Sequence, residues 1–166
     1  MRILGIDPGY ERLGIAILEK GNNAKPFGKA QGKERVLFSE CFKTKAELPF
    51  QERIALVGEK IKEVIKKYKP DILAIETLFM NTNQKTVMRV AEVRGVIIYE
   101  CARGKLSIFE ATPLQIKIAT TGYGRSEKSQ VMKMVKLLVD IEKNKTSDDE
   151  LDAIAAALTG FAHHRA

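Results

Sequence analysis

Residues 2–7 (RILGID) and 13–18 (LGIAIL) are two short apolar runs, separated by a turn that contains Pro8-Gly9. Apolar runs of this length bounded by turn residues are typical of buried strands, and two so close together predict a β-hairpin. The first run ends in an acid, Asp7. The hairpin is therefore the start of a sheet, and it carries a carboxylate at the end of its first strand.

The rest of the chain predicts how this sheet continues. Residues 19–35 are rich in Gly, Asn, Lys and Gln, which predicts a long, mobile loop before a third strand over 36–42. Apolar periodicity then predicts helices over 50–68, 86–101, 126–139 and 147 to about 162, a short helix opened by Pro113, and strands over 71–76 and 106–109. We expect an α/β fold in one domain over 1–166, with a five-stranded mixed sheet flanked by helices. In this sheet the third strand is expected to run antiparallel to the first, which also pairs with 71–76.

Composition narrows the class of protein. The 166 residues carry 28 Lys and Arg against 21 Asp and Glu, a formal charge of +7, which favours a polyanionic partner such as nucleic acid. Cys41 and Cys101 lack the spacing of a metal site and are expected to be reduced thiols. No signal segment and no membrane-spanning apolar run occurs in the sequence, so a cytoplasmic location is expected.

Two carboxylates stand at the ends of predicted strands. Asp7 ends the first strand, and Glu76 ends the strand over 71–76. Ligands of open α/β sheets gather beyond the carboxyl ends of the strands, so neighbouring strands would direct both acids into one crevice. The alternative is local: Asp7 could cap the turn before Pro8-Gly9, and Glu76 could cap a helix.

The last helix adds further acids. Ser147 and Glu150 form a capping-box pattern, and acids in a first turn suit the helix dipole, which accounts for Asp148, Asp149 and Glu150 without any function. Neither the capping box nor the helix dipole accounts for Asp152, which lies in an apolar, alanine-rich run. On a helical wheel, Asp148, Asp149 and Asp152 fall on one flank of the core stripe and Glu150 on the other. The wheel does not choose between Asp148 and Asp149.

These acids indicate a metal site. Carboxylates clustered at the edge of a core repel one another unless a cation neutralises them. Oxygen ligands without Cys or clustered His suit Mg²⁺, with Mn²⁺ as a substitute, rather than zinc. Four converging carboxylates are what two-metal phosphodiester hydrolysis requires, so two ions are expected in the site.

A set of short motifs runs in order through nearly the whole chain. These are 5–9 (GIDPG), Gly14, 74–76 (AIE), 79–81 (FMN), 122–124 (GYG), 127–131 (EKSQV), Asp149, Asp152, Ala153 and Ala155. They resemble the motifs of RuvC-type Holliday-junction resolvases. The resemblance implies an RNase H-like fold, a homodimer, and a Mg²⁺-dependent endonuclease that makes paired, symmetric nicks in four-way DNA junctions during recombination and repair. It also raises a branch-migration motor complex as a partner.

Carried over residue by residue, the resemblance makes four acids the metal ligands and selects Asp149 over Asp148. It makes Lys117 and Lys128 lysines near the scissile phosphate, and Phe79 a wedge between unstacked bases, although a core or dimer-face role is the alternative for Phe79. Lys85, Arg89 and Arg125 are the further DNA-binding residues expected. The four implied ligands are Asp7, Glu76, Asp149 and Asp152.

Three rival functions share parts of this pattern. The hairpin with Gly9 and Gly14 also resembles the phosphate-binding hairpin of actin-like kinases and ATPases, but those need two domains and 166 residues are too few. A related nuclease acting on RNA would lack the segment over 127–131. A non-catalytic junction-binding module of the same fold would lack one of the acids, and none is missing.

Overall fold

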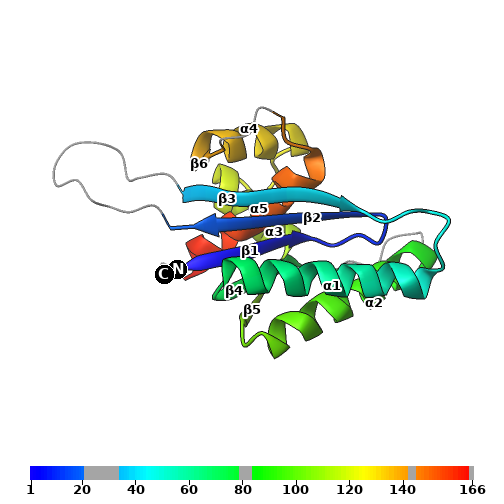
Figure 1. The fold of residues 1–166 in the computed structure, drawn as a ribbon. Helices are drawn as coiled ribbons and strands as arrows, with labels where there is room; N and C mark the ends of the chain where they lie inside the picture. The colour runs from blue at the N-terminus through cyan, green and yellow to red at the C-terminus, as the bar shows by residue number, and fades with distance from the viewer. Residues whose placement is uncertain (21–33, 79–83, 142–144, 165–166) are drawn as a thin grey trace.

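The structure is a computed structural model that describes residues 1–20, 34–78, 84–141 and 145–164. Its centre is a mixed six-stranded sheet with the order β5-β4-β1-β2-β3-β6 (Figure 1). The strands are β1 (Arg2–Asp7), β2 (Arg12–Glu19), β3 (Glu34–Lys43), β4 (Ile72–Glu76), β5 (Ser107–Ala111) and β6 (Val139–Asp140). The helices are α1 (Phe50–Tyr68), α2 (Gln84–Arg103), α3 (Pro113–Thr121), α4 (Lys128–Leu138) and α5 (Asp148–His163).

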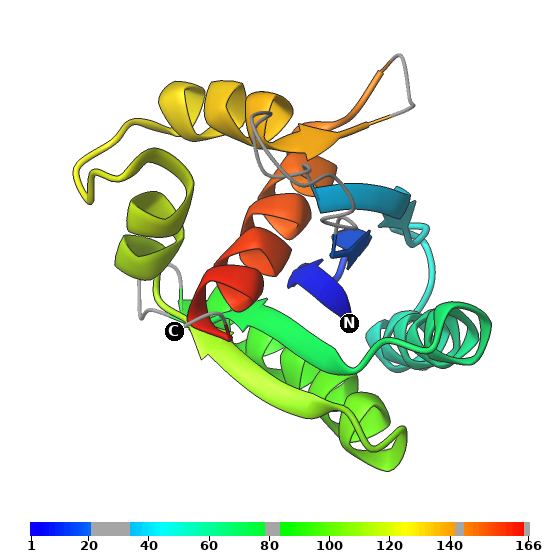
Figure 2. The same cartoon turned by 90° about the vertical axis from the view of Figure 1, so that its left-hand side faces the viewer.

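Helices cover both faces of the sheet, which explains why its central strands are continuous apolar runs. α1 and α2 lie on one face, and α5 lies against the other with α3 and α4 beyond it (Figure 2). Successive residues of β1 point to opposite faces. Ile3 accordingly belongs to the core under α5, whereas Leu4 and Ile6 belong to the core under α1 and α2.

The helix ends follow local sequence rules. Thr112 and Ser147 each accept, through the side-chain oxygen, a hydrogen bond from the backbone N–H three residues on, and the Glu127 N–H donates to Gln130 Oε1 at 2.8 Å, the reciprocal bond of a capping box. α3 ends at Gly122, whose φ of 75° is readily adopted only by residues such as glycine. The capping box predicted for the last helix is therefore present, and similar boxes begin the two helices before it.

The structure corrects two details of the expected sheet. It has six strands rather than five, because the two-residue β6 pairs with the first residues of β3. A strand of two residues is too short to produce a period in the sequence. The third strand pairs with β2 and so runs parallel to β1, not antiparallel to it, because β2 lies between them. The expected pairing of β1 with β4 is present and parallel.

Most of the long loop predicted over 19–35 lies outside the described residues, although its ends extend β2 to Glu19 and start β3 at Glu34. Within the described residues, no helix is both long enough and apolar enough to cross a membrane.

Candidate active site

The sheet brings Asp7 and Glu76 side by side. β1 and β4 are parallel neighbours, with Ile6 paired to Ile75, so the residue that follows each of these ends its strand at the same edge of the sheet. Both acids are half-buried there. Both acids therefore lie at the same edge of the sheet, as the strand ends predicted.

Two glycines allow α5 to approach this edge closely enough to add its own acids. A Cβ on Gly5 of β1 would lie 2.0 Å from the backbone oxygen of Ala153, and a Cβ on Gly14 of β2 would lie 2.1 Å from that of Asp149. Any side chain at these positions would push α5 away from the sheet. The glycines thus place the first two turns of α5 directly over the ends of β1 and β2.

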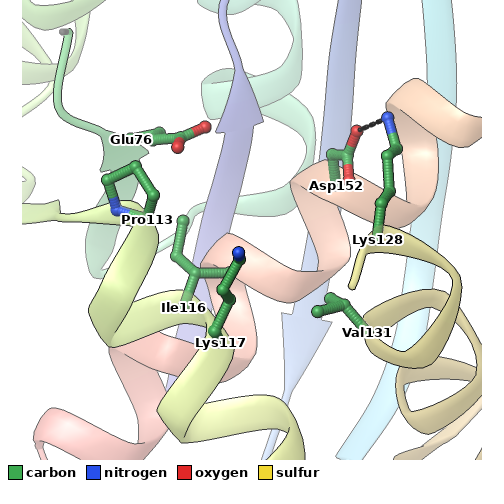
Figure 3. Close-up of a pocket in the computed structure, with 7 residues that line it drawn as sticks. All are labelled: Glu76, Pro113, Ile116, Lys117, Lys128, Val131 and Asp152. Atoms are coloured by element: carbon green, nitrogen blue, oxygen red, sulfur yellow. Dashed lines mark hydrogen bonds and ion pairs between the residues drawn. The ribbon is translucent and has the colours of Figure 1, made fainter. Parts of the chain in front are cut away.

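A cleft of about 250 Å³ opens between β4, α3, α4 and α5 (Figure 3). Glu76 points into it from the end of β4, Asp152 reaches it from α5, and the ammonium group of Lys117 points into the space between them. Lys128 of α4 lies at the side of Asp152. The residues that line the cleft are Glu76, Pro113, Ile116, Lys117, Lys128, Val131 and Asp152.

The electrostatics of Asp7 show that all four predicted acids interact. The pKa of Asp7 is raised from 3.8 to about 7, first by burial and then by the nearby charges of Asp152, Glu76 and Asp149, against a lowering effect of Lys128. The pKa of Glu76 is also raised, by burial first and then by Asp152. Like charges close enough to shift one another in this way need a cation when all are ionised.

Two of the acids form ion pairs with the chain's own cations. Lys128 Nζ donates to Asp152 Oδ2 at 2.9 Å, and this hydrogen bond raises the pKa of Lys128. Arg12 donates through Nε, at 3.0 Å, and through Nη2 to Asp149 Oδ2. Burial disfavours the ionised form of Asp149, but the hydrogen bonds from Arg12 and Cys41 outweigh it, so the pKa of Asp149 is lowered.

The acids converge without forming a closed metal cage. Within the described ranges, no three His, Cys, Asp or Glu side chains are gathered tightly enough to hold an ion together. The physical reason is visible in the two ion pairs, which draw the outer carboxylates of Asp149 and Asp152 toward Arg12 and Lys128. The donor set, four carboxylates at one edge of the sheet, still has the chemistry that Mg²⁺ or Mn²⁺ requires.

The other acids at the start of α5 have different surroundings. Asp148 is exposed, whereas the Glu150 side chain is buried, accepts a hydrogen bond from Ser39 at 2.6 Å and completes the capping box with Ser147. Asp149 rather than Asp148 is the acid that interacts with Asp7. The expected separation of Glu150 from the other acids is thus observed.

The expected DNA-binding residues lie on both sides of the sheet. Lys117, Arg125 and Lys128 lie on or beside α3 and α4, with Lys117 half-buried in the cleft. Lys85 and Arg89 are exposed on the first turns of α2, across the sheet, where the Arg89 guanidinium lies over the rings of Tyr10 and Phe50 at 5.7 and 5.0 Å. Phe79 lies outside the described residues.

Three contacts at the site were not expected from the sequence. Arg12 and Cys41 both contact Asp149, and Arg94 of α2 donates to the backbone oxygen of Glu76 at 3.2 Å. The register of β1, β2 and β3 would have indicated the first two, because Gly14 is the cross-strand partner of both Asp7 and Cys41. For Arg94, the sequence carries no comparable signal.

A mixed sheet with acids at the ends of its central strands, joined by acids from a helix packed across it, is the arrangement of RNase H-like nucleases. Fold and site place the chain in that class. Comparison with known proteins then identifies the family within this class. The family profile described as Crossover junction endodeoxyribonuclease RuvC matches residues 3–160. The RuvC of Thermosipho melanesiensis is 41% identical over 157 residues, covering 95% of this chain and 94% of that protein.

Two solved structures agree with this assignment. Thermus thermophilus RuvC matches with a TM-score of 0.86 and 27% identity, over 99% of this chain and 96% of that one. T. thermophilus RuvC in complex with a Holliday junction substrate matches with a TM-score of 0.88 and 25% identity, over 99% and 95% of the two chains. The chain belongs to the RuvC family of crossover junction endodeoxyribonucleases and is a nuclease of the hydrolase class.

Proposed function

We propose that the chain is a divalent-metal-dependent endonuclease that resolves four-way (Holliday) DNA junctions by paired, symmetric nicks. The observation that carries this proposal is the convergence of Asp7, Glu76, Asp149 and Asp152 at one edge of the sheet, in a chain of the RuvC family. The relative solved with a Holliday junction substrate supports four-way DNA as the substrate.

The same four acids are the proposed metal ligands, with Mg²⁺ as the ion and Mn²⁺ as a substitute. Hard oxygen ligands favour these ions. The pKa of Asp7 is raised by burial and then by repulsion from the neighbouring carboxylates, which supports a site that binds cations. When bound, two such ions supply a nucleophile from water and stabilise the charge on the departing 3′ oxygen.

The lysines of the cleft have a separate proposed part. Lys117 and Lys128 project into the cleft beside Glu76 and Asp152, so a phosphate attracted by cations at these acids would lie near both ammonium groups. There they would orient the scissile phosphate and stabilise the negative charge that grows on it in the transition state. Both are therefore proposed as catalytic residues that touch the substrate.

Further contacts are proposed along the DNA. Arg125 follows α3 and precedes Lys128, which extends the basic surface around the cleft. Lys85 and Arg89 are proposed to contact phosphates on the α2 side, and Phe79 to wedge between bases at the centre of the junction. Phosphate contacts of this kind make junction binding depend strongly on salt concentration.

The assembly follows from the symmetry of the substrate. Paired nicks in opposing strands need two active sites related by a two-fold axis, which a homodimer of this single nuclease domain, spanning 1–166, provides. On α2 the large side chains of Met88 and Tyr99 are 64% and 59% exposed, which supports this helix as the dimer face. A branch-migration motor complex is a further proposed partner. We propose that the protein acts in the cytoplasm, in recombination and repair.

The test uses a labelled synthetic four-way junction and a linear duplex of matched sequence, each incubated with the protein in Mg²⁺ or in EDTA. We expect paired, symmetric nicks in the junction alone, abolished by EDTA. Asp152→Asn is the matched control and should still bind the junction without cutting it. Equal cutting of both DNAs would reduce the function to general nuclease activity. Binding without cutting in any metal would indicate a non-catalytic junction-binding module.

A further inference from the structure

The Asp149 carboxylate is held by a cation that belongs to the chain. Arg12 donates to Oδ2 through both Nε and Nη2, and the Cys41 thiol donates to the same oxygen with Sγ 3.3 Å away. All three contacts are made to Oδ2, so together they fix the rotation of the carboxylate. Arg12 thus binds and orients one of the four proposed metal ligands.

The hairpin geometry determines this contact. Arg12 and Gly14 are two residues apart on β2 and therefore point to the same face of the sheet. Gly14 is where the backbone of Asp149 rests on β2, and Cys41 is the cross-strand partner of Gly14. A side chain at position 12 is consequently beside Asp149 whenever α5 is packed on the sheet.

The two proposed metal ligands on α5 each form an ion pair, Asp149 with Arg12 and Asp152 with Lys128. These pairs draw the carboxylates of Asp149 and Asp152 toward Arg12 and Lys128, away from Asp7 and Glu76. We propose that Arg12 is a built-in counter-ion of the metal site. It neutralises Asp149 while no divalent cation is bound, and a cation must compete with it for that carboxylate. This inference rests on the proposed function, in which Asp149 is a metal ligand.

Replacing Arg12 tests the competition for Asp149 without removing a residue of the proposed cleavage reaction, which replacing Lys128 would do. Lys128 lines the cleft and is proposed to touch the scissile phosphate, whereas Arg12 is not among the residues that line it. The Arg12 side chain is also 52% exposed, so its replacement leaves no unfilled space in the core. Removing the charge should tighten cation binding by about twofold to fivefold, the range expected for an exposed ion pair.

The experiment is a calorimetric titration of Mn²⁺ into the EDTA-treated full chain, without DNA and at fixed ionic strength. The variants are Arg12→Gln, Arg12→Lys, which keeps the charge, and Arg103→Gln. Arg103 is a matched control, because it is 60% exposed and its ion pair with Glu100 lies at the far end of α2. Melting temperatures with and without Mg²⁺ provide a second measurement.

We expect Arg12→Gln to bind Mn²⁺ more tightly than the wild type and to gain more thermal stability from Mg²⁺. Arg12→Lys and Arg103→Gln should bind as the wild type does. Equal or weaker binding by Arg12→Gln would overturn the counter-ion proposal while leaving the proposed function intact. Absence of Mn²⁺ binding to the wild type would overturn the counter-ion proposal. The same sample is then tested for junction cleavage in Mg²⁺, and absence of cleavage would overturn the proposed function as well.

Discussion

Asp7 is the residue whose surroundings most favour a neutral carboxyl. Burial and three neighbouring carboxylates raise its pKa from 3.8 to about 7. Between these two pH values the folded, metal-free protein keeps a proton that the unfolded chain has lost. The folded state then binds more protons than the unfolded state, so the free energy of unfolding decreases as the pH rises through this window.

Thermal unfolding in EDTA, followed from about pH 4 to about pH 8, checks this prediction. The wild type should lose stability across the window, and Asp7→Asn, which cannot ionise at position 7, should lose less. Saturating Mg²⁺ should flatten the wild-type curve, because a bound cation favours the ionised form. Parallel curves for the two proteins in EDTA would contradict the assignment of the raised pKa to Asp7.

Lys128 differs from the other lysines of α4 in where its ammonium group lies. It pairs with Asp152 at the cleft, whereas Lys133 of the same helix is not among the residues that line the cleft. Lys128→Ala should therefore slow junction cleavage by about a hundredfold, which corresponds to roughly 3 kcal/mol of lost transition-state stabilisation. Lys133→Ala is the control and should leave cleavage nearly unchanged.

Single-turnover cleavage rates and junction affinities, measured on the same preparations, separate the two effects. The rate should fall much more than the affinity for Lys128→Ala. An equal loss of rate and affinity would make Lys128 a phosphate contact without a part in the chemical step.

For individual residues, the sequence predicted which acids lie close together, but not which cationic side chains pair with them. Asp7 and Glu76 end apolar strands, and Asp152 interrupts an apolar helix face, so each is anomalous within its own segment. Arg12 is an ordinary charged residue after a turn. Its contact with Asp149 depends on the register between β2 and β3 and on the packing of α5, which are tertiary properties that a local pattern does not contain.

The contact between β1 and α5 is the element-scale feature on which the site depends. A Cβ at position 5 would lie 2.0 Å from the Ala153 oxygen, 2.8 Å from the Ala157 Cβ and 2.9 Å from the Ala157 nitrogen, so the backbone of α5 would have to move. Gly5→Ala should lower the free energy of unfolding by about 2–3 kcal/mol or more, the usual cost of overpacking a core. It should also misplace Asp152 and slow cleavage.

Chemical denaturation with the slope of the transition compared between proteins checks the stability effect. Full stability with normal cleavage would show that α5 can shift along the sheet without cost. That result would contradict the close approach described for these two elements.

The elements themselves were largely predictable. The helix over 50–68 was predicted with its observed bounds, because its apolar period is regular and Pro70 closes it. The other long helices differ from expectation by one or two residues at their ends, where capping rather than periodicity decides. The short β6 and the central position of β2 were missed, since strand order depends on which apolar faces meet across the sequence.

For the whole molecule, the proposed association of two chains is testable at one groove. A groove of about 500 Å³ between α1 and α2 is lined mainly by Phe50, Ile54, Val96 and Tyr99 with Gln51, Glu92 and Gly95. A charge in this apolar surface should prevent two copies from associating. Tyr99→Asp is therefore expected to convert a dimer into a monomer, and to replace paired nicks by single, uncoordinated ones.

Size-exclusion chromatography with light scattering, at micromolar protein concentration, gives the mass of the assembly in solution. Leu137→Asp is the control, because Leu137 is 62% exposed on α4, across the sheet from the groove, and its replacement should leave the dimer intact. A monomeric wild type would contradict the proposed assembly. A dimer that survives Tyr99→Asp would move the interface to another surface.

α5 has a consequence for how freely this protein can vary. Its residues from Glu150 to Phe161 are buried except for the half-buried Asp152, and its first turns carry two of the proposed ligands. A larger residue at one of its alanines should disturb the packing on β1 and reduce the amount of folded protein, whereas a neutral residue at Asp152 is expected to leave a folded but inactive one. Almost every substitution in α5 therefore lowers either the amount of folded protein or its activity, so we expect this segment to accumulate neutral changes far more slowly than exposed positions such as Lys133 of α4.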